Sequence, residues 1–296
     1  MASCRDVYLT SFNGDVTALD SVVHRFDKYD LEAPTIIQTE KSYYALMSHK
    51  TGYRPNSPWS QPFFVTPLNT RTYNSRSGFS LRVNGTKKAT YLYLGDQWDS
   101  RSVWESRYIW LPMSIDDDKK DLQLLWHDVY DLDVKTGEWS PVRGQTCFAN
   151  EAQVSGDAFK QEANFASNGS IVTGIYGNDI TVAFSGIEGT GKPQWVSFYY
   201  QNIDDMGFGD QPGGTPDRIG GTWVLRRISS VVVNGDEENV HELRQRDTHK
   251  SIILSTPSLL TLDEGSENTI TVGGLWNGND TKGADSDRIV VYPSED

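Results

Sequence analysis

The residues best suited to chemistry gather in the stretch Gly95–Met113, which reads GDQWDSRSVWESRYIWLPM. Flat aromatic rings alternate there with charged side chains: Trp98, Trp104, Tyr108 and Trp110 stand among Asp96, Asp99, Arg101, Glu105 and Arg107. Rings stack on the CH faces of sugars, while charged groups hydrogen-bond with sugar hydroxyls. The pattern is typical of a sugar-binding surface. The alternative is a tryptophan-rich corner of a β-core whose charges are solvated.

A second candidate is Glu32, which stands before Ala33 and Pro34 at the start of a strand-like run. Glycosidases need a carboxylic acid whose raised pKa lets it protonate the leaving oxygen. By residue type alone, a glutamate at such a place is usually a solvated surface group. The run Leu31–Ile37, the turn Gln38–Lys41 and the run Ser42–His49 predict a β-hairpin that carries this carboxyl.

The elements that position these residues are predicted to be short strands in two domains. The chain has 296 residues, 26 glycines, 12 prolines and 11% aromatic residues, which favours an all-β protein with turns between strands. The short segment Ser140–Gly144 breaks the pattern and marks the predicted boundary. Behind it, strands are predicted at Ser170–Tyr176, Asp179–Phe184, Gln194–Tyr200, Ser229–Val233, Lys250–Ser255, Asn268–Gly273 and Arg288–Tyr292.

Composition excludes several partner classes. The net charge of −13 argues against nucleic acid and suits a neutral ligand. No apolar run approaches the roughly 18–20 residues of a membrane span, and two cysteines predict no disulfide framework. The first residues lack the apolar stretch of a signal peptide, whereas sequons at Asn84, Asn168 and Asn279 are typical of secreted proteins.

The stretch Gly95–Met113 resembles the last propeller blade of glycoside hydrolase family 43, in its fungal exo-β-1,3-galactanase branch. Leu-Glu-Ala-Pro followed by Ser-Tyr-Tyr-Ala-Leu-Met-Ser-His resembles the segment that carries the acid of that family. The resemblance implies that Glu32 is the general acid of an inverting hydrolysis of β-1,3-galactosyl linkages. It also implies that Trp98 and Tyr108 contact substrate, and that the partner is a plant-type galactan or arabinogalactan.

The chain departs from the family pattern in two ways. Arg76 stands where the resemblance expects a glutamine that holds the attacking water, and a guanidinium cannot accept a proton. The chain also begins only about thirty residues before Glu32, so residues 1–143 are expected to hold only the last blades of a five-bladed β-propeller, as an open stack of about two. We therefore expect hydrolysis to be undetectable or very weak.

Residues 144–296 resemble a family 35 carbohydrate-binding module, through Asn-Thr-Ile-Thr-Val and the ending Asp-Arg-Ile-Val-Val-Tyr. The resemblance implies a jelly-roll β-sandwich with a structural calcium at Glu151 and Asp287, although Gln153 replaces a second acid. Its loops offer candidate sugar ligands, for which Asx turns are the alternative role: Tyr176, Asn202, Asp204, Trp276, Asn277, Asn279 and Asp280.

Taken together, the sequence predicts an all-β, carbohydrate-active protein with a partial propeller and a β-sandwich. The first hypothesis is a galactan 1,3-β-galactosidase-like hydrolase that needs no catalytic cofactor. The alternative is a non-catalytic protein that binds galactan through its C-terminal module, and a third is a gene product without an independent role. The resemblance implies an extracellular location, although no signal peptide is present in this sequence.

Overall fold

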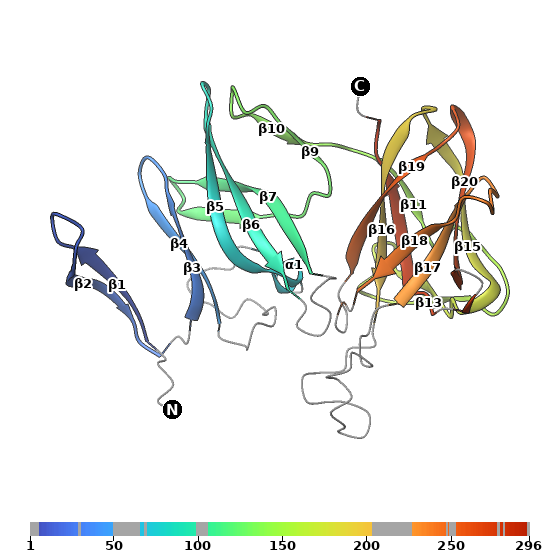
Figure 1. The fold of residues 1–296 in the computed structure, drawn as a ribbon, viewed down its shortest axis with the longest axis horizontal. Coiled ribbons are helices and arrows are strands. Elements are labelled where there is room, and N and C mark those ends of the chain that lie inside the picture. Colours follow the sequence, from blue (N-terminus) through green and yellow to red (C-terminus); the bar gives the residue numbers. More distant parts are fainter. Residues whose placement is uncertain are drawn as a thin grey trace, which may run out of the picture. The chain divides into compact units, whose positions relative to one another are not determined.

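The computed structural model describes residues 6–28, 31–49, 66–67, 70–98, 106–202, 227–246, 248, 253–276, 279–280 and 282–294. The chain divides into two compact units. Unit 1 comprises Met1–Trp126 and Leu132–Trp139, and unit 2 comprises His127–Asp131 and Ser140–Asp296. The short strands β9 (Tyr130–Leu132) and β10 (Trp139–Pro141) pair with each other where the chain passes from one unit to the other (Figure 1).

Unit 1 consists of antiparallel hairpins and one four-stranded sheet. The hairpins are β1 (Val7–Phe12) with β2 (Leu19–Phe26), and β3 (Leu31–Gln38) with β4 (Tyr43–His49). The sheet has the order β5 (Arg76–Asn84), β6 (Ala89–Gln97), β7 (Arg107–Asp116) and β8 (Asp121–Leu124). The predicted hairpin that carries Glu32 is confirmed by β3 and β4.

Period-two patterning explains the core of unit 1. Tyr91 and Tyr93 on β6 are buried together with Ile109, Leu111 and Met113 on β7, because side chains two apart share one face of a strand. Ile37 and Leu46 from the β3–β4 hairpin join the same cluster. The buried side chains therefore attach the hairpin to the sheet, and each fully buried aliphatic one contributes about 1.5–3 kcal/mol.

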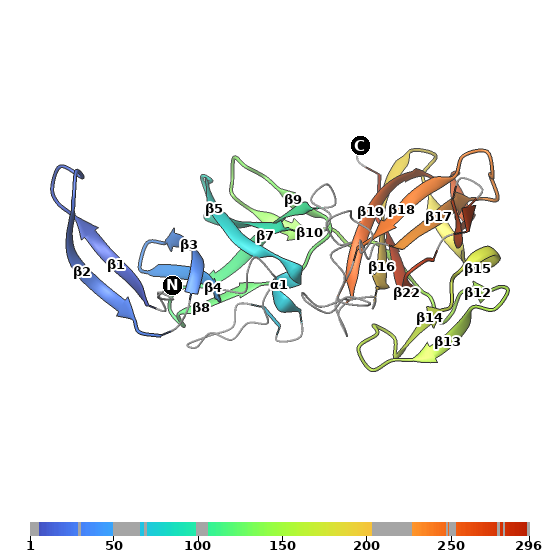
Figure 2. The ribbon, with the colours of Figure 1, turned by 60° about the horizontal axis from the view of Figure 1, so that its bottom comes forward.

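Unit 2 consists of two antiparallel sheets of six strands each, several of whose strands are labelled in Figure 2. The first has the order β13 (Phe159–Glu162), β14 (Ser170–Thr173), β22 (Asp285–Val291), β16 (Pro193–Gln201) and β19 (Leu254–Thr261), with β11 (Gln145–Phe148) also on β22. The second has the order β12 (Gln153–Val154), β15 (Gly177–Gly189), β20 (Gly265–Trp276), β17 (Arg227–Val233) and β18 (His241–Gln245), with β21 (Asn279–Asp280) also on β20.

One buried cluster joins the two sheets of unit 2. Val196 and Phe198 on β16 and Ile289 on β22 come from the first sheet, while Val182 on β15 and Val272 on β20 come from the second. These strands carry β-branched and aromatic residues on their inward faces, as a half-buried pleated surface favours. Unit 2 therefore has a hydrophobic core of its own.

The all-β prediction is confirmed. Within the described ranges, the one helical segment is α1 (Arg71–Asn74), and none of the sheets there closes into a barrel. No helix in those ranges has the length and apolarity that crossing a membrane requires.

Candidate functional site

The two residues that the sequence marked for catalysis, Glu32 and Arg76, form an ion pair in unit 1. A guanidinium nitrogen of Arg76, Nη2, donates a hydrogen bond to Oε1 of Glu32 across 44 positions of sequence. The Arg76 side chain is 10% exposed and that of Glu32 is 29% exposed. The first residue of β5 thus meets the second residue of β3 at a partly buried place.

An irregularity in β3 orients the Glu32 carboxyl. The pairing of β3 with β4 shifts register between Glu32 and Thr35, and Ala33 has a φ of 52°. The left-handed region is uncommon for a residue with a side chain, and Pro34 keeps Ala33 out of the right-handed helical region. Such bulges bend a strand and redirect its side chains, often beside functional sites. Glu32 itself pairs with Ser48, so the irregularity follows directly after the residue that meets Arg76.

The backbone before Arg76 is strained. Thr72, Tyr73 and Asn74 have φ values of 52°, 55° and 58°, so α1 is a left-handed turn built from residues with side chains. Each such residue costs roughly 1–2 kcal/mol, and strain of this kind persists only where surrounding contacts enforce it.

Hydrogen bonds clamp this turn. The Tyr73 hydroxyl donates to the Leu124 carbonyl at 3.0 Å, and Gln97 Nε2 donates to the Tyr73 carbonyl at 2.7 Å. Ser75 Oγ lies 3.1 Å from the buried Tyr93 hydroxyl. Burial raises the pKa of Tyr73 to about 12 and raises the pKa of Tyr93 as well, so both hydroxyls stay protonated donors. The clamp fixes the start of β5, and with it Arg76.

Charge at the pair works against acid catalysis. Burial lowers the pKa of Arg76 from its ordinary value of 12.5, yet that value lies so far above neutrality that the guanidinium keeps its charge. A cation in contact with a carboxylate favours the ionised form of that carboxylate. A general acid must instead carry a proton when substrate arrives. The contact with Arg76 thus opposes the protonation that a general acid at Glu32 would need.

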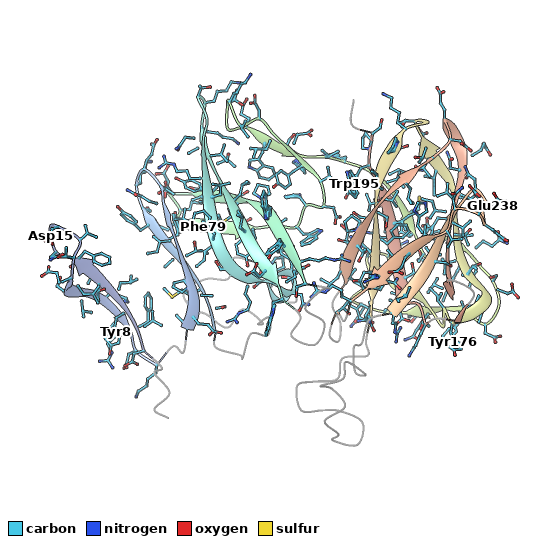
Figure 3. The ribbon with its side chains drawn as sticks, in the orientation of Figure 1. Tyr8, Asp15, Phe79, Tyr176, Trp195 and Glu238 are labelled. Carbon is cyan, nitrogen blue, oxygen red and sulfur yellow. The ribbon has the colours of Figure 1, made fainter. Side chains whose placement is uncertain are left out.

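The aromatic motif lies on the same sheet. Tyr108 on β7 is 79% exposed, Trp110 is also exposed, and Trp98 follows the end of β6 in a half-buried position. Asp96 pairs with Arg76 on one side and with Tyr108 on the other, so these residues share one row across three strands. Exposed Phe79 on β5 (labelled in Figure 3) is aligned with Leu94 and Trp110, which lie two positions along β6 and β7 from that row. Trp104 lies outside the described residues.

The predicted sugar-binding residues of unit 2 lie in different surroundings, and some of them are outside the described residues. Tyr176 is 57% exposed and forms an isolated bridge with Lys282 (Figure 3). Trp276 ends β20 and pairs with Asn279, while Asp280 pairs with Leu275, so the two flanks of the predicted loop pair as β20 and β21. The side chains of Trp276, Asn279 and Asp280, together with all of Asp204 and Asn277, lie outside the description.

Asn202 requires a correction. Its side chain is fully buried, and its Nδ2 donates to the Gln245 carbonyl at 3.2 Å. Its backbone nitrogen donates to Thr248 Oγ1 at 3.0 Å. Asn202 therefore holds two chain segments together and does not face a ligand, because an asparagine amide can satisfy backbone groups inside a protein as well as sugar hydroxyls outside it.

Sequence reasoning missed a polar cluster that begins close to Tyr176. Arg227 on β17 donates to the Gly283 carbonyl at 3.2 Å, and its Nη1 lies 3.6 Å from Asp285 Oδ1. Thr173 Oγ1 donates to the same carboxyl oxygen at 2.7 Å. Both charged side chains are more than nine-tenths buried. No motif marks Arg227, since its burial depends on strands that are distant in sequence.

The residues predicted to hold calcium do not form a site that fits the ion. Asp287 Oδ1 accepts from the Ser167 nitrogen at 2.8 Å, and Oδ2 accepts from the Ser167 hydroxyl and from Arg288. Glu151 is exposed and accepts from Asn168 Nδ2 at 3.3 Å. Calcium needs six to eight oxygen ligands, and a guanidinium on one of its carboxylates repels it. Among the described residues, no group of three acidic, histidine or cysteine side chains converges.

No family model and no curated protein matches the sequence. Solved structures that match the chain include exo-β-1,3-galactanases and family 35 carbohydrate-binding modules. The likeness to exo-β-1,3-galactanase structures that the sequence motifs indicated is confirmed.

The exo-β-1,3-galactanase from Phanerochaete chrysosporium, solved with β-1,3-galactotriose, is similar over 97% of this chain and 63% of its own, with 26% identity and a TM-score of 0.79. The same enzyme with galactose gives the same values. A family 35 module from Clostridium thermocellum matches 50% of this chain and 98% of its own at 17% identity, with a TM-score of 0.39. The chain thus spans less than two thirds of the galactanase that it resembles.

Proposed function

We propose that this chain is a carbohydrate-active protein of the exo-β-1,3-galactanase type whose ligand is β-1,3-galactan. The likeness in fold to the Phanerochaete chrysosporium galactanase, over 97% of this chain, carries the proposal. That enzyme was solved with β-1,3-galactotriose. Acidic composition suits a neutral polysaccharide of this kind. We further propose that the polymer is a plant-type arabinogalactan and that the protein acts outside the cell.

Within this function, Glu32 occupies the position of the general acid, while Trp98 and Tyr108 supply rings for sugar stacking. Unit 2 acts as a family 35-type β-sandwich that adds affinity for galactan through Tyr176, Trp276, Asn279 and Asp280. Weak binding by two units on one chain raises the overall affinity for a polymer, because the second contact is intramolecular.

The ion pair favours binding over hydrolysis. Arg76 stabilises the charge of Glu32, and it offers no acceptor for the proton of an attacking water. General acid catalysis supplies about 10²–10⁴-fold in rate, and it is lost while the carboxyl stays ionised. We therefore infer that the chain holds galactan and hydrolyses it very slowly or not at all.

Affinity electrophoresis in β-1,3-galactan tests the ligand, with β-1,4-galactan and cellulose as competing polymers. We expect retardation by β-1,3-galactan alone, and equal migration in all three gels would contradict the proposal. Galactose release from β-1,3-galactan tests the chemistry. Rapid release that Glu32→Gln abolishes and the exposed turn variant Glu40→Gln leaves intact would establish the hydrolase instead.

A further inference from the structure

The hairpin turn between β13 and β14 in unit 2 carries an open cavity of about 700 Å³. Its principal lining residues are Glu162, Asn164, Phe165, Asn168, Gly169 and Ser170. None of them is among the sugar ligands that the sequence predicted. Ligand sites are typically concave spaces of about 300–1,000 Å³ with an aromatic wall and a few polar groups. The cavity has this size and this composition.

The turn that forms the cavity is pre-formed by backbone hydrogen bonds. Glu162 pairs with Ser170 in the β13–β14 register. The Ala163 nitrogen donates to the Gly169 carbonyl at 2.9 Å, and the Ala166 nitrogen donates to the Ala163 carbonyl at 3.0 Å. Gly169 has a φ of 74°, which a side chain would resist. A ligand that enters pays little entropy for ordering this loop.

Neighbouring residues orient the polar wall. Asn168 Nδ2 donates to Asn150 Oδ1 at 3.2 Å and to Glu151 Oε1 at 3.3 Å. No described residue donates to the Asn168 side-chain oxygen, which leaves that acceptor for a ligand. Ser167, next to it, is fixed by its backbone hydrogen bond to the fully buried Asp287 carboxylate. The amide of Asn168 is therefore held in one orientation by residues outside the cavity.

The lining chemistry selects the class of ligand. Phe165 is a half-buried ring that can stack on the CH face of a sugar, while Asn164, Asn168 and Glu162 can bond to hydroxyls. The lining contains one carboxylate and neither lysine nor arginine. An anionic sugar would meet a like charge without a compensating cation, so the cavity suits a neutral one.

We propose that this cavity is a second glycan-binding site of unit 2, separate from the Tyr176 region, and that it takes neutral galacto-oligosaccharides. The inference rests on the proposed galactan ligand. It implies that one chain offers two weak sites within unit 2, so that a polymer binds more tightly than a disaccharide does.

The test is a titration of the full chain with β-1,3-galactobiose, in which binding is monitored by backbone amide chemical shifts and by calorimetry. The protein is made in bacteria, so that the sequon Asn168-Gly169-Ser170 carries no glycan and the lining residues are tested by themselves. We expect shifts in residues 162–170 and about three- to tenfold weaker binding at this site in Phe165→Ala, from loss of ring stacking. Phe159→Ala is the matched control, since Phe159 is an exposed ring on β13 outside the cavity.

Separate outcomes distinguish the two proposals. If the wild type binds galactobiose and Phe165→Ala binds it equally with unchanged shifts in residues 162–170, the second site is refuted while galactan binding stands. If the wild type binds no galactan at all, the proposed function itself fails. Phe165→Leu keeps apolar volume without a flat ring, and it should lose affinity at an unchanged melting temperature. Glucuronic acid serves as the anionic probe, and binding at this site equal to that of galactobiose would refute the neutral-ligand assignment.

Discussion

At the scale of single residues, the contact between Arg76 and Glu32 joins β5 to β3 at a partly buried place and should therefore contribute to stability. Removing one partner of a buried ion pair usually costs several kcal/mol, because it leaves an uncompensated charge. Glu32 keeps 29% of its side chain exposed, so water can screen part of that charge. The contact should therefore be worth less than a fully buried pair.

We expect Arg76→Gln to lower the free energy of unfolding by about 1–2 kcal/mol, a value discounted for the exposure of Glu32. Glu32→Gln should cost a similar amount, and the double variant should cost less than the sum of the two, since both changes remove one interaction. Urea unfolding of the four proteins measures this coupling. Glu40→Gln, on the exposed turn of the same hairpin, is the control and should change stability by less than about 0.5 kcal/mol. Additive losses would mean that the two side chains do not interact in solution.

The sequence identified these two residues but could not predict their contact. Glu32 and Arg76 were marked by resemblance to family motifs, one as the acid and the other as a departure. Their meeting depends on the bulge at Ala33 and on the left-handed turn at Thr72–Asn74. Neither threonine nor tyrosine signals such a conformation, since left-handed backbone is read from glycine or asparagine in a sequence.

At the scale of elements, the left-handed turn α1 stores strain where β5 begins. Thr72 is β-branched, and such residues are the least tolerant of a positive φ. The Tyr73 and Gln97 hydrogen bonds hold the turn in place against that cost. A residue without a side chain at position 72 would adopt the same φ without steric conflict.

We expect Thr72→Gly to raise the free energy of unfolding by up to about 1 kcal/mol, the relief of left-handed strain minus the extra freedom of glycine in the unfolded chain. Thr146→Gly is the matched control, because Thr146 is exposed in the regular strand β11, and glycine there should destabilise by about 0.5–1 kcal/mol. Chemical unfolding measures both. Equal destabilisation by the two changes would show that residue 72 is not left-handed in solution.

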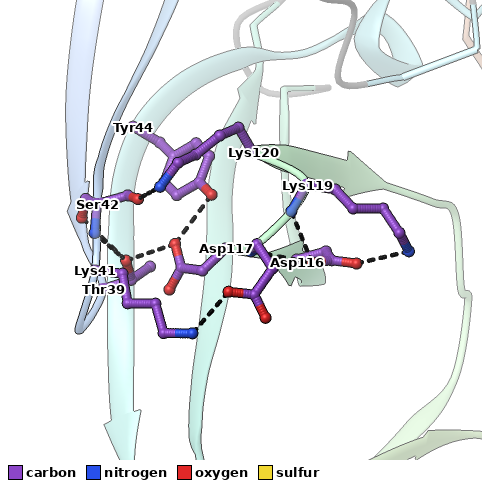
Figure 4. A network of polar contacts seen from close by, with 9 residues as sticks. Thr39, Lys41, Ser42, Tyr44, Asp116, Asp117, Lys119 and Lys120 are labelled. Atoms are coloured by element: carbon purple, nitrogen blue, oxygen red, sulfur yellow. Dashed lines mark hydrogen bonds and ion pairs between the residues drawn. The ribbon is translucent and has the colours of Figure 1, made fainter.

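A polar network joins the tip of the β3–β4 hairpin to the turn between β7 and β8 (Figure 4). Asp117 Oδ1 accepts from Thr39 Oγ1 at 2.8 Å and from the Tyr44 hydroxyl at 3.0 Å. Lys41 forms an ion pair with Asp118 at 2.7 Å. The network holds the far end of the hairpin whose other end carries Glu32.

Acid should loosen this attachment. Desolvation raises the pKa of Asp117, but hydrogen bonds from Thr39, Tyr44 and Ser42 outweigh it, and the net pKa is lowered from 3.8. A carboxyl whose pKa is lowered in the folded state contributes stability that is fully present above its ordinary pKa. That stability is lost as the pH falls from the ordinary pKa through the lower pKa of the folded state. We expect the wild type to lose more stability than Asp117→Asn between pH 5 and pH 3, measured by urea unfolding. Identical losses would exclude a contribution from Asp117.

Strand prediction succeeded where β-branched and aromatic residues were dense and failed where strands were short. The predicted runs at Gln194–Tyr200 and Arg288–Tyr292 overlap β16 and β22, which carry runs of β-branched and aromatic residues. The short strands β11, β12 and β13 were missed, and β13 is exposed along its whole length. Such strands form because a neighbour supplies hydrogen bonds, and their own side chains carry little signal.

At the scale of the whole molecule, the first question is whether calcium binding stabilises the folded chain. The Asp287 carboxylate is already satisfied by Ser167 and Arg288. We therefore expect neither millimolar calcium nor excess chelator to shift the melting temperature of the chain by more than about 1 °C, because a metal stabilises only when it binds the folded state. A rise of several degrees with calcium would show that further donors complete the site. Arg288→Leu should lower the melting temperature, since it removes the cation that balances Asp287.

The second question is where unit 2 begins, because the unit includes residues that precede the predicted boundary at 144. Asp128 belongs to the segment 127–131 of unit 2. Its carboxylate accepts hydrogen bonds from the hydroxyls of Tyr199, Tyr292 and Ser255, the last at 2.6 Å. Burial, and then the charge of Asp128, raises the pKa of Tyr199 and of Tyr292, so both remain donors. The segment is therefore part of the folded unit.

We expect a fragment of residues 127–296 to unfold at a higher urea concentration than one of residues 144–296, by about 1–3 kcal/mol in free energy. The shorter fragment leaves three part-buried hydroxyls without the acceptor that Asp128 provides, and an unmet buried donor costs about 1 kcal/mol or more. Asp128→Ala in the longer fragment should reproduce most of the loss, whereas Asp131→Ala, at a neighbouring position of the same segment, should not. Equal stability of the two fragments would place the boundary of the unit after residue 143, as the sequence alone suggested. It would also mean that residues 127–131 contribute nothing measurable to the stability of the unit.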